Sequence, residues 1–280
     1  MSSLRRATLA LLAVCALSAC GTTGPAGTSG PGQDLVEAAP TATARDQLAH
    51  RADVPTSPTP RVRPTPTRTT RSTPPANDAS RLRSLPSTTT QVIVVQANGF
   101  GTSVGTLQAF EKSGGRWTPA FDRMPARLGS RGFTDTMAEG TPATPTGVYS
   151  IGATMYGIAA NPGVRYSYHR LVENDWWNEN AETAGYNTFV HGADPGGPSE
   201  ALWETDPQYR YFAVINYNIP VREASPPRGS GIFLHVMIPG RPTAGCVAIA
   251  ESDLVKVLRW LNPAAKPRIV LAPTGELDRY

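Results

Sequence analysis

The alternation of apolar and polar residues changes character at about residue 88. Downstream of this point, short β-branched or alternating segments recur between turns, which is the pattern of β-strands. Ser113-Gly114-Gly115 predicts a turn after which residues 116–121 return as a hairpin strand. The other predicted strands cover residues 91–95, 106–111, 146–151, 209–217, 232–238 and 268–271.

One helix is expected near the C-terminus. Ser252 can cap a run whose apolar side chains lie on one helical face, and Asn262-Pro263 ends it. The apolar residues of that face are Leu254, Val255, Leu258 and Leu261. Many short strands with one or two helices predict a single, mostly β domain over residues 89–280.

Residues 20–88 have a different composition, dominated by Thr, Pro, Ser, Ala, Gly and Arg. Such a segment buries too little apolar surface to offset its ordering entropy, so we expect a disordered, extended tether. A passive spacer is favoured. The alternative, in which its arginines contact anionic lipid or wall polymers, stays open.

The first 19 residues predict an export signal. Two arginines precede a short apolar run, which is too short to cross a bilayer as a permanent helix. Leu17-Ser18-Ala19-Cys20 resembles the lipobox of bacterial lipoproteins, so Cys20 is the expected lipidation site. We therefore expect anchoring to the outer face of the cytoplasmic membrane. An ordinary signal peptide is the alternative.

Charge and cysteine content narrow the function. From residue 88 onward, 16 Lys and Arg side chains stand against 17 Asp and Glu, which argues against a nucleic-acid-binding domain. Of the three cysteines, Cys15 would be removed and Cys20 lipidated. Cys246 would then be the single free thiol in an oxidising compartment, either reactive or a buried structural residue.

Cys246 follows His235 by 11 positions (246 − 235), and His235 lies inside an apolar strand. A histidine beside a thiol can stabilise the thiolate and so generate a nucleophile. Gly245 permits a tight backbone in which the N–H groups of Gly245 and Cys246 bind an oxyanion. The alternative for His235 is a satisfied core histidine.

Thr243-Ala244-Gly245-Cys246-Val247, with His235 upstream, resembles the active-site signature of YkuD-type L,D-transpeptidases. The segments 144–149, 176–177 and 186–187 are similar to other parts of that family. The resemblance implies a β-sandwich domain and a cysteine-dependent acyltransferase that acts on peptidoglycan stem peptides. It implies Cys246 as the nucleophile and His235 as the general base, with no cofactor and no metal.

The chain departs from the family pattern at several positions. Ala244 replaces a histidine, Ala248 replaces a polar residue, and the spacing from histidine to cysteine is short. Thr243 and the spare imidazole of His191 are candidate supporting residues. Trp, Tyr and Asn side chains between 176 and 187 are expected either to line the donor groove or to form a packing cluster.

Three other functions stay open at this stage. A thiol L,D-carboxypeptidase on the same scaffold would differ only in using water to resolve the thioester. A non-catalytic wall-binding lipoprotein would show a Cys246 that resists electrophiles. A metal site is disfavoured because its candidate ligands lack short spacings; they are His169, His191, His235 and Cys246, with Asp194 three residues after His191. The sequence predicts no oligomeric state.

Overall fold

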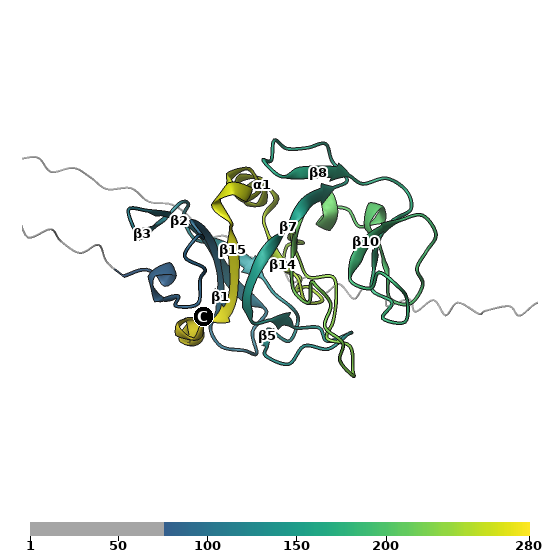
Figure 1. Ribbon diagram of the computed structural model, residues 1–280, viewed down its shortest axis with the longest axis horizontal. Coiled ribbons are helices and arrows are strands. Elements are labelled where there is room, and N and C mark those ends of the chain that lie inside the picture. The colour runs from purple at the N-terminus through teal and green to yellow at the C-terminus, as the bar shows by residue number, and fades with distance from the viewer. Residues whose placement is uncertain (1–75) are drawn as a thin grey trace, which may run out of the picture. The chain divides into compact units, whose positions relative to one another are not determined.

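The computed structural model describes residues 76–280. The predicted signal peptide, Cys20 and the tether as far as residue 75 lie outside the described residues. The largest sheet has ten strands, and Figure 1 shows β1, β15 and β7 side by side in it. Its strands are β1 (Gln91–Ala97), β2 (Val104–Ser113), β3 (Arg116–Pro119), β4 (Met124–Arg127), β7 (Gly147–Gly157), β8 (Ser167–Arg170), β12 (Phe212–Ile215), β13 (Phe233–Val236), β14 (Val247–Ile249) and β15 (Arg268–Pro273).

This sheet closes on itself. The strand order is β1-β15-β7-β12-β13-β14-β4-β2, and β2 pairs with β1 again. The expected β-sandwich is therefore wrong, and the domain is a mostly β, barrel-like sheet. Alternation along a strand shows that one face is buried, but a sandwich and a closed barrel both bury one face, so the sequence could not separate them.

Strand β1 is buried at all seven positions. Ile93 and Val95 point into the barrel core, whereas Val92 and Val94 pack outside it against Ala79. Ala79 belongs to the 3-10 helix η1 (Asp78–Arg81), which Asn77 caps. The folded domain thus begins before residue 89, because this short helix covers the outer face of β1.

Smaller elements complete the domain. Two short sheets pair β5 (Phe133–Thr134) with β6 (Thr144–Pro145), and β10 (Thr188–His191) with β9 (Asp175–Asn178) and β11 (Glu200–Ala201). Figure 1 places β10 on the side of the barrel away from β2 and β3. The remaining 3-10 helices are η2 (Leu202–Glu204), η3 (Gln208–Arg210), η4 (Pro263–Ala265) and η5 (Thr274–Arg279).

Residues 76–280 contain one α-helix, α1 (Glu251–Trp260), which differs from the prediction in two details. Its N-cap is Ala250, which makes no side-chain cap, so Ser252 is not the capping residue. Its buried face consists of Leu254, Val257 and Leu258. Packing of this face on the barrel, together with two acidic residues in the first turn, replaces the missing cap.

Two predicted strands are shorter than expected. Within residues 209–217 only β12 is a strand, because Tyr209 belongs to η3. Within residues 232–238 the strand β13 covers four positions, all buried. The predicted hairpin is confirmed, since β2 pairs antiparallel with β3 across Gly114 and Gly115.

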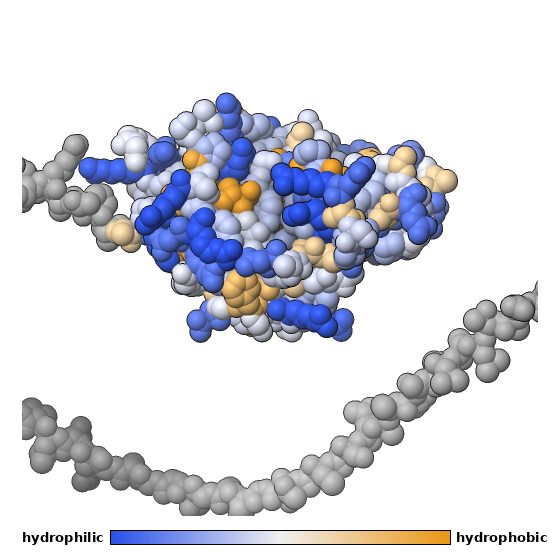
Figure 2. Space-filling model, turned by 60° about the horizontal axis from the view of Figure 1, so that its bottom comes forward, coloured by the Kyte–Doolittle hydropathy of each residue, from blue (hydrophilic) through white to orange (hydrophobic). Residues whose placement is uncertain are grey.

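Large apolar side chains are rarely exposed in the described part of the chain; the exposed ones are Phe100, Val104, Val172 and Val221. The face in Figure 2 is mostly hydrophilic, with small separate apolar spots. None of the helices within residues 76–280 has the length and apolar character needed to span a membrane.

Candidate active site

The two residues of the predicted catalytic pair are positioned by two neighbouring parallel strands. His235 lies within β13 and pairs in register with Ala248 of β14. Cys246 directly precedes β14, at the end of the short loop that connects the two strands. The chain leaves β13 and returns to the start of β14 in ten residues (237–246), which places Cys246 beside Phe233, two positions before His235.

The Cys246 thiol is held by the backbone on the N-terminal side of β13. Its Sγ donates a hydrogen bond to the Gly231 carbonyl (3.2 Å) and accepts one from the Phe233 N–H (3.3 Å). Cys246 is only 8% exposed and packs in an aromatic cluster with Trp177, Tyr209 and Phe233. The thiol therefore has one fixed orientation and a narrow route to the surface.

Gly231 is required at this position for two reasons. Its φ of +63° is in the left-handed region, and a Cβ there would overlap the Glu179 carboxylate. Gly245 is required by close packing instead, since a Cβ would lie 3.1 Å from the Ala143 carbonyl oxygen. The tight backbone expected around the cysteine is thus present.

The His235 ring is oriented by its own strand. Its Nδ1 lies 2.8 Å from the Val236 carbonyl oxygen, and because a carbonyl only accepts, Nδ1 carries the proton. Nε2 is then free to act as a base. Burial lowers the pKa of His235 to about 4, so the imidazole is neutral at physiological pH. A pre-formed imidazolium, one part of the sequence argument, is therefore absent.

Thr243 fixes the turn that carries the cysteine. Its hydroxyl donates to the Cys246 carbonyl oxygen (2.6 Å) and accepts from the Gly245 N–H (3.2 Å). Its own backbone bonds to Leu128 and Ser130. Thr243 therefore supports the turn, but the Gly245 N–H is occupied. Among the turn and loop hydrogen bonds of residues 76–280 none uses the Cys246 N–H, which leaves it as the candidate oxyanion donor.

Cys246 lines two cavities. The first, about 280 Å³, is lined by Cys246 together with His235, Tyr209 and Arg241. The second, about 320 Å³, is lined by Cys246 together with Glu139, Glu179 and Ser230. Ala244 and Glu200 line both. The thiol and the imidazole thus share the first cavity, although they are not hydrogen-bonded to each other.

Carboxylates surround the thiol on the side of the second cavity. Burial and, after it, the charges of Glu200 and Glu139 together raise the pKa of Glu179 to about 8. Burial also raises the pKa of Glu200, whose carboxylate accepts a hydrogen bond from the buried Tyr209 hydroxyl. Sequence reasoning missed all three glutamates, because they come from separate segments of the chain and no local pattern marks them.

The same environment acts on the nucleophile. Burial raises the pKa of the Cys246 thiol well above its usual range, and the Glu200 carboxylate raises it further. At rest the pair is therefore a neutral thiol and a neutral imidazole, so any attack by sulfur must be coupled to proton transfer.

The segment between Trp176 and Asn187 has a packing role. The Trp177 indole donates to the Asn187 Oδ1 (3.0 Å) and lies edge-on against Phe233. Asn187 Oδ1 also accepts from the Gly231 N–H (3.1 Å). Neither Trp177 nor Asn187 lines the two cavities of Cys246. Trp177 and Asn187 therefore belong to a packing cluster beside the thiol.

His191 is not close to the thiol. Its Nδ1 bonds to the buried Asp175 carboxylate (2.8 Å), and His169 Nε2 bonds to the other oxygen of that carboxylate (2.8 Å). The structure therefore separates His169 and His191 from His235 and Cys246. Within the described residues, no group of three or more His, Cys, Asp and Glu side chains is arranged to hold a metal ion.

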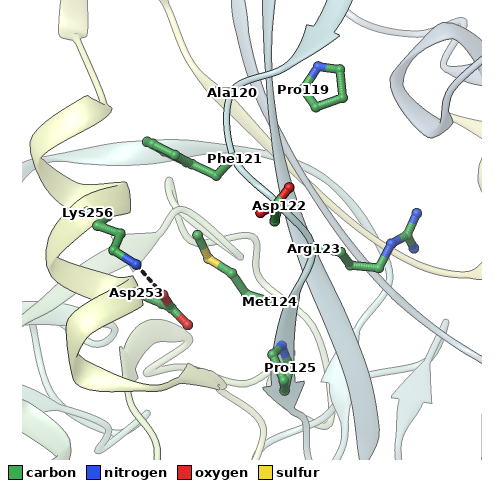
Figure 3. A pocket seen from close by; sticks show the side chains of 9 residues that line it. All are labelled: Pro119, Ala120, Phe121, Asp122, Arg123, Met124, Pro125, Asp253 and Lys256. Atoms are coloured by element: carbon green, nitrogen blue, oxygen red, sulfur yellow. Dashed lines mark hydrogen bonds and ion pairs between the residues drawn. The ribbon is translucent and has the colours of Figure 1, made fainter. Parts of the chain in front are cut away.

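The largest cavity described, about 660 Å³, lies elsewhere, between the β3–β4 connection and α1. Figure 3 shows its lining, in which Lys256 points to Asp253 at 3.0 Å. It contains neither a thiol nor an imidazole, so it lacks a nucleophile with a base. The chemistry is concentrated at the smaller cavities around Cys246.

Comparisons with known proteins identify the family of the chain. A family model described as the L,D-transpeptidase catalytic domain (YkuD) matches residues 91–270, and the chain belongs to this family. No curated protein matches the chain. A solved structure, that of Bdellovibrio bacteriovorus Bd1075, is 16% identical over 68% of this chain with a TM-score of 0.34. The chain covers 52% of that protein, about half its length.

The domain over residues 91–270 is therefore an L,D-transpeptidase-family domain. The matched range contains both His235 and Cys246.

Proposed function

We propose that this protein is a peptidoglycan L,D-transpeptidase in which Cys246 is the nucleophile and His235 the general base. The supporting observation is that both side chains line one cavity, His235 from β13 and Cys246 from the residue directly before β14. The chemistry follows from the residue types. A thiol can form a thioester with a peptide carbonyl, and a neutral imidazole can accept the thiol proton.

In the first half-reaction, His235 Nε2 takes the thiol proton while Sγ attacks the carbonyl between the third stem residue and the terminal D-alanine. The carbon–sulfur bond forms, and the carbon–nitrogen bond then breaks. The proton on His235 passes to the departing amine, so D-alanine leaves and the stem stays on Cys246 as a thioester.

In the second half-reaction, an amine from a neighbouring stem attacks the thioester carbonyl. His235 takes the proton from this amine, the new amide bond forms, and the proton returns to sulfur as the carbon–sulfur bond breaks. The Cys246 N–H stabilises the oxyanion of both tetrahedral intermediates. The resting thiol is neutral, so rapid attack requires substrate in place before the proton moves.

The test is product analysis by mass spectrometry. The purified chain is incubated with disaccharide-tetrapeptide, beside Cys246→Ala. Release of D-alanine with cross-linked dimers, both absent in the variant, is the expected result. Release without dimers would instead identify a thiol L,D-carboxypeptidase. Absence of both products would favour the non-catalytic wall-binding role.

The place of action is a second part of the proposal. The signal-like segment before Cys20 supports export and lipidation of Cys20, with the domain reaching the wall from the outer face of the cytoplasmic membrane. Metabolic labelling with an alkyne fatty acid tests this. Label is expected on the wild-type chain and not on Cys20→Ser; label on neither would contradict it.

A further inference from the structure

The cavity shared by Cys246 and His235 has a polarised lining. The cavity is lined by one basic side chain, Arg241, and one acidic side chain, Glu200. The Glu200 carboxylate is already engaged by the Tyr209 hydroxyl. No carboxylate in residues 76–280 lies within ion-pair distance of the Arg241 guanidinium. Arg241 therefore presents an unneutralised positive charge at the mouth of the catalytic cavity.

The position of Arg241 is set by the loop between β13 and β14. The Arg241 N–H bonds to the Ile238 carbonyl oxygen (3.1 Å), across Pro239 and Gly240. Gly240 has a φ of +77°, which together with Pro239 is the pattern of a type II turn. Two residues later, the Thr243 N–H bonds to Leu128 (2.9 Å). The backbone of Arg241 is thus held between two fixed points, although its side chain is exposed.

The two cavities beside the thiol differ in charge. The second cavity is lined by Glu139, Glu179 and Glu200 and by no lysine or arginine. An anion that approaches Cys246 therefore meets a positively charged side chain only in the first cavity. Ala248, which also lines the first cavity, offers no polar side chain, so Arg241 is the strongest anion-binding group beside the thiol in the first cavity.

The geometry of the donor peptide makes this relevant. In the proposed reaction the bond that breaks joins the third residue to the last, so the terminal carboxylate is separated from the reacting carbonyl carbon by only an N and a Cα. These atoms span about 3–4 Å. A residue that binds this carboxylate must therefore line the same cavity as the nucleophile, and Arg241 does.

We propose that Arg241 binds the terminal carboxylate of the donor peptide and so selects stems that end in a free carboxylate. This inference rests on the proposed transpeptidase function. Arg241 acts as a specificity residue and takes no part in proton transfer. Loss of one charge-assisted contact should cost about 10- to 100-fold in the preference for a free carboxylate.

The experiment compares two donors, a tetrapeptide with a free C-terminal carboxylate and the same peptide as its C-terminal amide. Acylation of Cys246 in the full chain is followed by mass spectrometry at a series of donor concentrations. The wild type should prefer the acid by at least about tenfold. Arg241→Gln should lose this preference because its reaction with the acid slows more than its reaction with the amide, and Arg241→Lys should keep part of the preference.

Arg222→Gln is the matched control, because Arg222 is exposed and lines neither cavity. It should behave as the wild type does. An Arg241→Gln variant that still prefers the acid overturns the inference. So does an equal loss with both donors, which would indicate a purely structural role for the loop.

A second readout separates this inference from the proposed function. Binding of both peptides is titrated calorimetrically to Cys246→Ala, with and without Arg241→Gln. If the wild type is never acylated, the proposed function fails, yet tighter binding of the acid that depends on Arg241 would still support the carboxylate site. Equal binding of acid and amide, or no binding of either, overturns it.

Discussion

Asn187 Oδ1 accepts a hydrogen bond of 3.1 Å from the Gly231 N–H, and the carbonyl of Gly231 in turn accepts the Cys246 thiol. Asn187 also donates through Nδ2 to the carbonyl oxygens of Tyr217 and Asn218 (3.1 Å each). The buried Asn187 side chain thus connects two segments: Gly231, which precedes β13 and holds the thiol, and the loop after β12. A residue outside the two cavities therefore controls the position of the thiol.

Asn187→Ala should destabilise the fold and slow acylation of Cys246. It removes the acceptor for the Gly231 N–H and the Trp177 indole, and each buried unsatisfied donor costs about 1–3 kcal/mol. The free energy of unfolding in urea measures the first effect, and acylation by a donor peptide measures the second. The backbone also contributes, since Asn187 has a φ of +57°.

Asn174→Ala provides the matched control. Asn174 has a φ of +70° and an exposed side chain, so it carries the same backbone cost without the buried hydrogen bonds. The difference in the free energy of unfolding between the two variants measures the contribution of the Asn187 hydrogen bonds. Equal losses of stability would show that the network contributes nothing beyond the left-handed backbone.

Glu200→Gln should make the Cys246 thiol more reactive. Burial is the main cause of the raised thiol pKa, and the Glu200 charge is the second. Glutamine removes that charge but still accepts the hydrogen bond from the Tyr209 hydroxyl. Alkylation by iodoacetamide below the thiol pKa should therefore become several-fold faster, because its rate follows the thiolate fraction. Glu204→Gln, at an exposed position four residues on, should leave the rate as it is. A rate unchanged in Glu200→Gln would contradict this electrostatic coupling.

His235 should make stability depend on pH in a defined window. Its pKa is about 4 in the folded state and about 6.5 in the unfolded chain, so between these values only the unfolded chain takes up the proton. The stabilisation is complete above pH 6.5 and is lost as the pH falls toward 4, by up to about 3 kcal/mol. Urea unfolding at several pH values measures it.

In His235→Gln this contribution to the pH dependence should disappear between pH 4 and 6.5. The donor-acylation rate should be lost as well, because glutamine cannot take the thiol proton. An identical slope of stability against pH in both proteins would show that His235 is not the buried neutral base described above.

Thr243→Val should loosen the cysteine turn. Valine has the same shape as threonine but leaves the buried Gly245 N–H without its acceptor, at a cost of about 1–3 kcal/mol. Thr243→Ser keeps the hydroxyl and should retain most of the stability and acylation rate. If the serine variant were as impaired as the valine variant, the methyl group and not the hydroxyl would be the relevant feature.

The sequence predicted the individual strands and the helix better than the closure of the sheet into a barrel. Residues 92–95 are β-branched without interruption, and they form part of a strand buried on both faces. Nothing in this local pattern specifies that β1 pairs with β15 as well as with the next strand, β2, because β1 and β15 are far apart in the chain. Closure is a long-range property of all the strands together.

The candidate site follows the same division. His235, Thr243 and Cys246 lie in one short stretch, and the structure places them around one cavity. His191 was a candidate only because it is an imidazole, and the buried Asp175 holds it elsewhere. Asn187 and Glu200 come from other segments of the chain; a signal for Asn187 was its position after Gly185-Tyr186, where asparagine tolerates a left-handed backbone.

The central claim is that Cys246 forms a thioester with the donor peptide, and intact-mass spectrometry during turnover tests it most directly. With a tetrapeptide donor, the account predicts an adduct equal to the donor minus D-alanine, mapped to Cys246. His235→Gln should form it far more slowly. A wild-type chain that releases D-alanine without this adduct, or carries it on another residue, would contradict the account.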